Sequence, residues 1–102
     1  MKYLITGKRN VVPMPTERAA ELFQGAKAWM NARLADGRLE CHYVFAGLGG
    51  GFAVRNADSH EQVLDELLDY PLYPFFDWEV HSLCDYGHSY DKLTEYFQRL
   101  AG

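Results

Sequence analysis

The chain has few cysteines, no excess of basic residues and no long apolar run. Its two cysteines cannot build a disulfide framework, which favours a reducing, cytoplasmic location. Ten basic residues against fourteen acidic ones give a formal net charge of -4, and no basic tract is present, so no nucleic-acid partner is expected. The apolar start at residues 3–5 is too short for a signal peptide or a membrane span. These absences favour a cytoplasmic protein that binds neither nucleic acid nor a membrane.

Apolar and aromatic side chains are abundant instead. Hydrophobic residues make up 48% of the 102 positions and aromatic residues 15%, which is typical of a globular protein and not of a disordered one. This length is suited to a single core, and no linker, internal repeat or low-complexity stretch divides the chain. We therefore expect one domain over residues 1–102.

The hydrophobic periodicity predicts four strands and three helices. The segments with the alternation of strands are 2–9, 39–46, 51–56 and 76–83. The segments with helical spacing run from Thr16 to about residue 35, from the capping box of Ser59 and Gln62 to Pro71, and from about residue 91 to 100. This order is that of a ferredoxin-like α+β fold, a split βαβ arrangement (βαββαβ plus a C-terminal helix) with an antiparallel sheet. Both main helices then cover one face of the sheet, and a second subunit is expected to cover the other.

Polar side chains recur at alternate positions of the predicted strands. In a regular strand such residues share one face, opposite the neighbours that pack under the helices. The side chains that this alternation places on the helix-free face are Glu40, His42, Arg55, Glu79 and His81. Tyr43 and Trp78 fall on the helix-covered face. If the strands neighbour one another as the topology predicts, the five polar residues meet where a second subunit covers the sheet.

An acid–base pair enclosed in this way can move a proton next to a carbonyl without a cofactor. In this hypothesis His42 removes the proton, Glu40 or Glu79 orients the imidazole, and His81 returns the proton. Arg55 binds the developing oxyanion. The alternative is a solvated sheet face with ordinary salt bridges, which is the commoner arrangement.

Two motifs suggest other chemistry, and each has a simpler explanation. The glycine cluster at residues 47–50 could be taken for a phosphate-binding loop, but such a loop leads into the N-terminus of a helix. A strand follows here, which predicts a hairpin turn.

Cys41 and His42, together with residues 81–88, contain the side chains that zinc prefers. Adjacent residues of a strand point to opposite faces, so we predict no metal site.

Residues 67–84, LLDYPLYPFFDWEVHSLC, combine two prolines three positions apart with aromatic residues, acids and a histidine. This stretch resembles the C-terminal half of muconolactone isomerase. The resemblance implies a dimeric α/β barrel built into a homo-oligomer, with a small-molecule substrate and no cofactor. That family moves a proton along a lactone ring. Its second strand carries arginines suited to a carboxylated lactone, whereas residues 39–44 carry none, so we expect a substrate other than muconolactone itself.

The resulting prediction is a cofactor-free isomerase or cyclase that shifts a proton next to the carbonyl of a lactone or cyclic ketone. Arg55, Tyr43 and Trp78 are the candidate substrate-binding residues. One alternative is a cofactor-free monooxygenase of the dimeric-barrel type, with an aromatic pocket around Tyr43, Phe76 and Trp78. Another is a non-catalytic ligand-binding or oligomeric scaffold protein.

Overall fold

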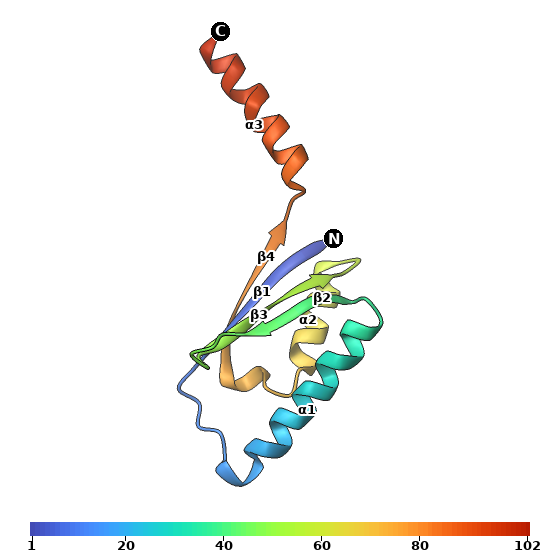
Figure 1. The fold of residues 1–102 in the computed structure, drawn as a ribbon, viewed down its shortest axis with the longest axis vertical. Coiled ribbons are helices and arrows are strands. Elements are labelled where there is room, and N and C mark those ends of the chain that lie inside the picture. The colour runs from blue at the N-terminus through green and yellow to red at the C-terminus, as the bar shows by residue number, and fades with distance from the viewer.

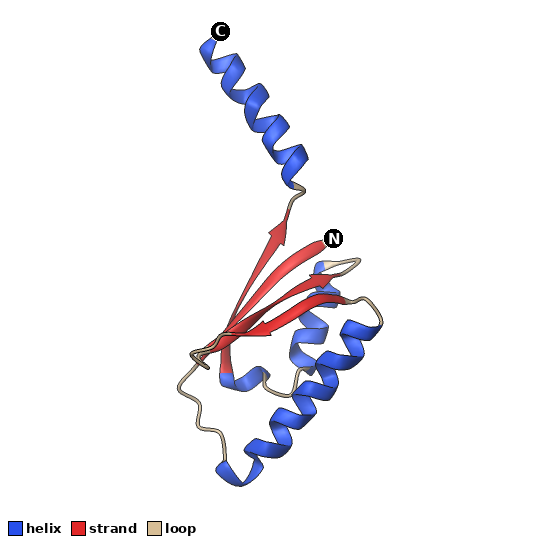
Figure 2. Cartoon of the chain, in the orientation of Figure 1, coloured by secondary structure: helices blue, strands red, loops and turns tan.

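Four strands and three α-helices make up the computed structural model, which describes all residues from Met1 to Gly102. In chain order the elements are β1 (Lys2–Arg9), α1 (Thr16–Ala35), β2 (Leu39–Val44), β3 (Gly50–Asn56), α2 (His60–Asp69), the short 3-10 helix η1 (Tyr73–Phe75), β4 (Phe76–Leu83) and α3 (Tyr86–Ala101). The sheet has the order β2-β3-β1-β4, with all neighbouring strands antiparallel. Helices α1 and α2 lie on one side of it (Figures 1 and 2). The predicted ferredoxin-like α+β fold is confirmed.

Two helix starts differ from the sequence-based expectation. Helix α3 begins at Tyr86, five residues earlier than predicted, because the Asp85 carboxylate accepts a hydrogen bond from the His88 amide at 2.9 Å and caps the first turn. The sequence predicts a helix from Thr16, a residue type that can serve as the N-cap, but Thr16 is already the first helical residue of α1. Pro15 precedes it, and no side chain caps this end.

A β-bulge in β2 changes which residues face the helices. Leu39 pairs with Arg55 and Cys41 pairs with Val54, so Glu40 is an extra residue opposite β3. Beyond Glu40, each side chain of β2 therefore faces the side of the sheet opposite to the one that a regular strand would give it. As a result Leu39 and His42, three positions apart, both line the space under the helices.

The buried apolar side chains form two separate clusters. One consists of Tyr3, Ile5, Ala57 and Val63, and the other of Ala26, Tyr70 and Leu72. The Trp78 side chain packs against both clusters and lies over β1 at Gly7, where a Cβ atom would stand 2.7 Å from the indole. Only glycine leaves room for the ring there. The two clusters enclose the cavity described below, because members of both line it.

Helix α3 stands away from the rest of the molecule (Figure 1). None of its residues is buried, and the molecule measures 65 × 29 × 24 Å along its principal axes. None of the helices has the length and apolar character needed to cross a membrane.

Candidate active site

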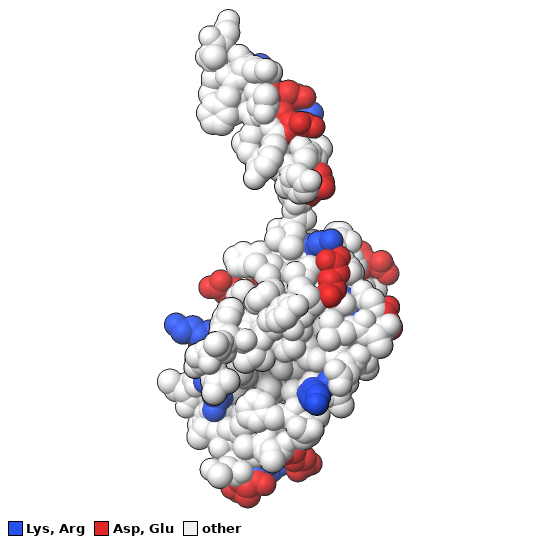
Figure 3. Space-filling model, viewed as in Figure 1, with Lys and Arg blue, Asp and Glu red and all other residues white.

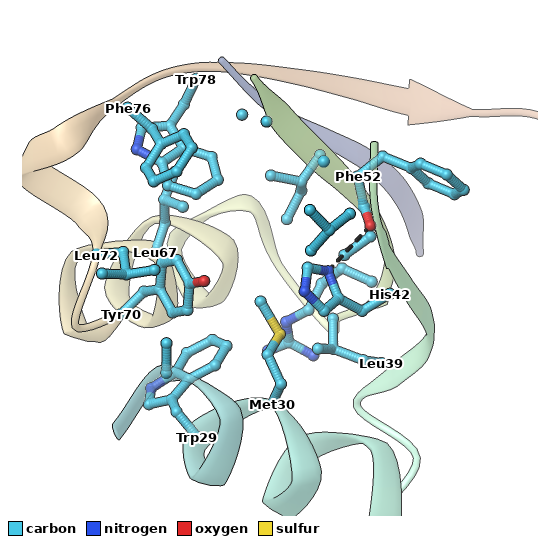
Figure 4. Close-up of a pocket in the computed structure, with 18 of the residues that line it drawn as sticks. Trp29, Met30, Leu39, His42, Phe52, Leu67, Tyr70, Leu72, Phe76 and Trp78 are labelled. Carbon is cyan, nitrogen blue, oxygen red and sulfur yellow. Dashed lines mark hydrogen bonds between the residues drawn. The ribbon is translucent and has the colours of Figure 1, made fainter. Parts of the chain in front are cut away.

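A cavity of about 570 Å³ lies between the helix layer and the sheet. Its walls are mainly apolar, and the aromatic side chains among them include Trp29, Tyr70, Phe76 and Trp78 (Figure 4). Phe23 also lines the cavity, whereas the Phe52 ring points away from it. This volume is within the range of pockets that hold one small organic molecule. The helix-covered side of the sheet therefore contains the candidate site, whereas the sequence placed it on the opposite side.

His42 is presented to this cavity by the bulge in β2. Its Nδ1 atom lies 3.1 Å from the backbone carbonyl oxygen of Phe52 on β3 (Figure 4). A carbonyl oxygen only accepts, so Nδ1 carries the proton and donates it. In the neutral imidazole Nε2 is then the unprotonated nitrogen, and it faces the cavity. A half-buried imidazole held in this tautomer is suited to act as a general base.

The Tyr70 hydroxyl points into the cavity from the opposite wall, toward His42 (Figure 4). Tyr70 follows the last residue of α2, and its ring packs between Trp29 and Trp78, at centroid distances of 5.0 and 5.7 Å. The residue is 8% exposed, and burial raises the pKa of Tyr70 to about 12. The hydroxyl therefore keeps its proton at neutral pH and can donate a hydrogen bond to an oxygen atom in the cavity.

The raised pKa of Tyr70 predicts an alkaline loss of stability that Tyr70→Phe removes. Up to about pH 10 the phenol is protonated in both the folded and the unfolded state. Between there and the folded-state pKa of about 12, only the unfolded state releases the proton, so stability falls as pH rises. The wild type should lose about 2–3 kcal/mol more unfolding free energy than the variant over this range. Urea unfolding from pH 9 to pH 12 measures the difference, with the exposed Tyr43→Phe as the matched control. Equal slopes for wild type and Tyr70→Phe would contradict the assignment.

Arg55 belongs to a charged network in the cavity wall. It is 3% exposed, and its Nη2 atom lies 3.1 Å from Oε1 of Glu66 on α2. Its Nη1 atom donates to the backbone carbonyls of Arg38, at 3.1 Å, and of Asn56. Glu66 also pairs with Arg38 at 2.6 Å and with Arg33 at 3.4 Å. Because Arg55 is already engaged in this way, it holds α2 against β3 and is not a free cation for an oxyanion.

Three of the predicted catalytic residues lie away from the cavity. Glu40, the bulged residue, pairs with Lys2 at 2.7 Å, and this hydrogen bond lowers the pKa of Glu40. His81 and Glu79 form an exposed pair at 3.3 Å on the helix-free face. The prediction that these residues meet His42 and Arg55 on one face is wrong, because the structure places His42 and Arg55 under the helices.

The two aromatic candidates for substrate binding are also separated by the sheet. Trp78 lines the cavity. Tyr43 was expected under the helices, but the change of phase in β2 turns it to the helix-free face. There it packs against Phe52 with a centroid distance of 5.8 Å. Tyr43 is therefore not part of the cavity.

Cys41 and Cys84 are free thiols. No group of three or more histidine, cysteine, aspartate or glutamate side chains is close enough together to hold a metal ion. The zinc-like residue types around Cys41 and residues 81–88 therefore do not form a cluster.

Tyr70 is the residue that sequence reasoning missed. It lies between α2 and Pro71, and its ring packs against Trp29 and Trp78. The available signal was the hydroxyl itself, because a tyrosine at a buried helix end needs a partner for its polar tip. Its hydroxyl has no hydrogen-bond partner within the chain and points into the cavity.

The fold and the cavity define a class of ferredoxin-like α+β proteins with a small-molecule pocket between sheet and helices. Among solved structures the chain is similar to muconolactone isomerase, determined at 3.3 Å, with 25% identity, a TM-score of 0.75, and coverage of 84% of this chain and 91% of that one. It is also similar to 5-chloro-2-hydroxyhydroquinone dehydrochlorinase from Burkholderia phenoliruptrix AC1100, in complex with 2,5-dihydroxybenzoquinone. That match has 17% identity, a TM-score of 0.67, and coverage of 86% and 98% respectively, and it bears on the fold alone. No family model and no curated protein matches the chain. The protein therefore has a muconolactone isomerase-like fold.

Proposed function

We propose that this protein is a cofactor-free enzyme that shifts a proton next to the carbonyl group of a small unsaturated lactone or cyclic ketone. The observation that carries the proposal is the pairing of His42 and Tyr70. An imidazole with a free Nε2 atom faces a protonated phenol across an apolar cavity. The likeness to muconolactone isomerase supports an isomerisation.

The proposed reaction begins with a flat substrate between the aromatic walls. His42 Nε2 removes a proton from the carbon beside the carbonyl, and the electron pair moves onto the carbonyl oxygen. The Tyr70 hydroxyl donates a hydrogen bond to that oxygen and stabilises the enolate. The imidazolium of His42 then returns the proton to a carbon further along the conjugated system. Between the two steps the proton on His42 can exchange with solvent. One proton is removed and one is returned, so the net change is the position of a double bond.

The substrate is neutral or weakly acidic in this proposal. The cavity walls are aromatic and apolar, and no arginine of β2 enters the cavity. Arg55 is engaged by Glu66, so a carboxylate in the cavity would have to pair with Arg9 or Lys27, the other two cationic residues of the lining. The apolar walls and the absence of arginine from β2 support a substrate other than muconolactone itself.

Deuterium uptake from heavy water tests the proposal. The enzyme is incubated with a panel of unsaturated lactones and cyclic ketones, muconolactone included, and each compound is analysed by mass spectrometry. We expect catalytic incorporation of deuterium next to the carbonyl, or further along the conjugated chain, of at least one compound. An absence of uptake across the panel would reject the proton-transfer mechanism.

A cofactor-free monooxygenase is the second candidate, because Phe76 and Trp78 provide the aromatic wall expected for it. Oxygen consumption with a polyphenolic substrate, without deuterium exchange, would favour it. A non-catalytic protein would bind compounds of the panel and give neither signal.

The helix-free face of the sheet supports a homo-oligomer. Tyr43 and Phe45 are exposed on it and pack around Phe52, with centroid distances of 5.8 and 6.3 Å. An aromatic face of this kind is suited to contact with the same face of a second copy. A dimeric α/β barrel is the arrangement that we propose for this contact.

A further inference from the structure

The sheet forms the floor of the cavity, and His42 and Trp78 lie at opposite ends of that floor. His42 belongs to β2 and Trp78 to β4, which are the two edge strands of the sheet. Both side chains line the cavity, and Figure 4 shows them on opposite sides of it. Three strand spacings of about 4.8 Å separate β2 from β4, so the floor is about 14 Å wide. A single lactone ring beside His42 therefore covers only part of the floor.

Between these two ends the floor carries little side-chain volume. His42 pairs with Ala53 on β3, and on the neighbouring row of inward-facing residues Gly51 on β3 pairs with Gly7 on β1. Gly7 in turn pairs with Trp78 on β4. Ala53, Gly51 and Gly7 all line the cavity, and none of them has a polar side chain. These three small residues form a trough that crosses β3 and β1 from the imidazole to the indole.

The Trp78 indole closes the far end of the trough and is held there. Its Nε1 atom donates to the backbone carbonyl of Tyr73 at 3.1 Å, and its ring packs against the Tyr70 and Phe76 rings at centroid distances of 5.7 Å. The three atoms nearest to a Cβ placed on Gly7 all belong to this indole. Gly7 does not have a positive φ, so its backbone does not require glycine, and the missing side chain makes room for the indole. The indole therefore covers β1 and leaves the floor over β3 open.

We propose that Trp78 determines the length of the compound that the cavity accepts. The position of the reacting ring, between His42 and Tyr70, rests on the proposed function. An apolar substituent of that ring then lies over β3 and ends against the indole. An uncharged substituent fits this place, because the trough has no charged side chain and the surface of the body between its charged groups is largely uncharged (Figure 3). The ligand class is a cyclic ketone or unsaturated lactone with a short alkyl substituent.

Binding of γ-alkyl butenolides, unsaturated lactones with one straight alkyl chain, tests this length limit. Isothermal titration calorimetry gives the Kd for each chain from methyl to octyl. For the wild type the Kd should fall about three- to fourfold with each added methylene group, the value of burying one CH₂ group, until the chain reaches the indole. Longer chains should bind no more tightly. In Trp78→Leu the limit should move to chains about three or four methylene groups longer, because one strand spacing of floor is opened over β1.

Trp29→Leu is the matched control, because Trp29 also lines the cavity but belongs to α1 and not to the floor. This variant should change the Kd of all chains alike and leave the limit where it is. Gly7→Ala should shorten the limit, since its Cβ atom lifts the indole into the cavity. The same substitution added to Trp78→Leu should not shorten it. The comparison of Trp78→Leu with Trp29→Leu decides the proposal alone if Gly7→Ala does not fold, which circular dichroism establishes.

An unchanged limit in Trp78→Leu, or an equal shift in Trp29→Leu, would overturn the role of Trp78. An absence of saturable binding for every chain would overturn the trough as a binding site. Binding requires no proton transfer, so this test is separate from the test of the proposed reaction. A length limit set by Trp78 without any deuterium exchange would reject the reaction and retain the role of Trp78.

Discussion

Replacing His42 with alanine is expected to lower the rate of deuterium exchange by about 10²–10⁴-fold, the usual contribution of a general base. The variant removes the one imidazole that lines the cavity, together with its hydrogen bond to the Phe52 carbonyl. The measurement is the initial rate of mass increase for whichever panel compound the wild type labels fastest. Circular dichroism and thermal unfolding establish that the variant is folded.

Two further variants separate chemistry from position. His42→Gln can still donate a hydrogen bond to the Phe52 carbonyl but takes up no proton at neutral pH, so it should be as slow as alanine. His81→Ala removes the same type of residue from the helix-free face and should keep the wild-type rate. Loss of deuterium exchange in His81→Ala, with exchange retained in His42→Ala, would mean that the active site lies on the helix-free face.

The architecture was predictable because its signals are local. Pro71 ends α2, alternation marks β1 and β4, and the glycines at 47–50 open a turn between β2 and β3. The stretch at residues 67–84 added the resemblance that the solved structures support. Each of these signals acts over a few residues, and none depends on how strands align with one another.

The placement of the site was not predictable because it depends on register. A single bulged residue, Glu40, changes which side of the sheet every later residue of β2 faces. In β3 both sides carry apolar residues, so polarity does not distinguish them. Ala53 and Arg55 face the helices, while Val54 lies on the other side beside Cys41. Arg55 is tolerated in this buried position because Glu66, eleven residues further along the chain, pairs with it from α2.

Removing Glu66 is accordingly expected to destabilise the protein by about 3–5 kcal/mol, the usual cost of leaving a buried charge without its partner. Glu66 contacts Arg33, Arg38 and Arg55, and Arg55 is almost wholly buried. Urea unfolding of Glu66→Ala measures the loss as a lower midpoint at unchanged slope. Asp36→Asn is the matched control, because it removes only the exposed second partner of Arg38 and should change the midpoint little.

A double variant distinguishes a lost interaction from an uncompensated charge. If the cost comes from Arg55 left alone, replacing both residues, as Glu66→Met with Arg55→Met, should restore part of the stability that Glu66→Ala loses. If the double variant is less stable than Glu66→Ala, the pair itself contributes net attraction. A small loss in Glu66→Ala would contradict both explanations, and would mean that water reaches Arg55 through the cavity. The size of the stability loss in Glu66→Ala therefore also indicates whether water reaches the cavity wall beside His42.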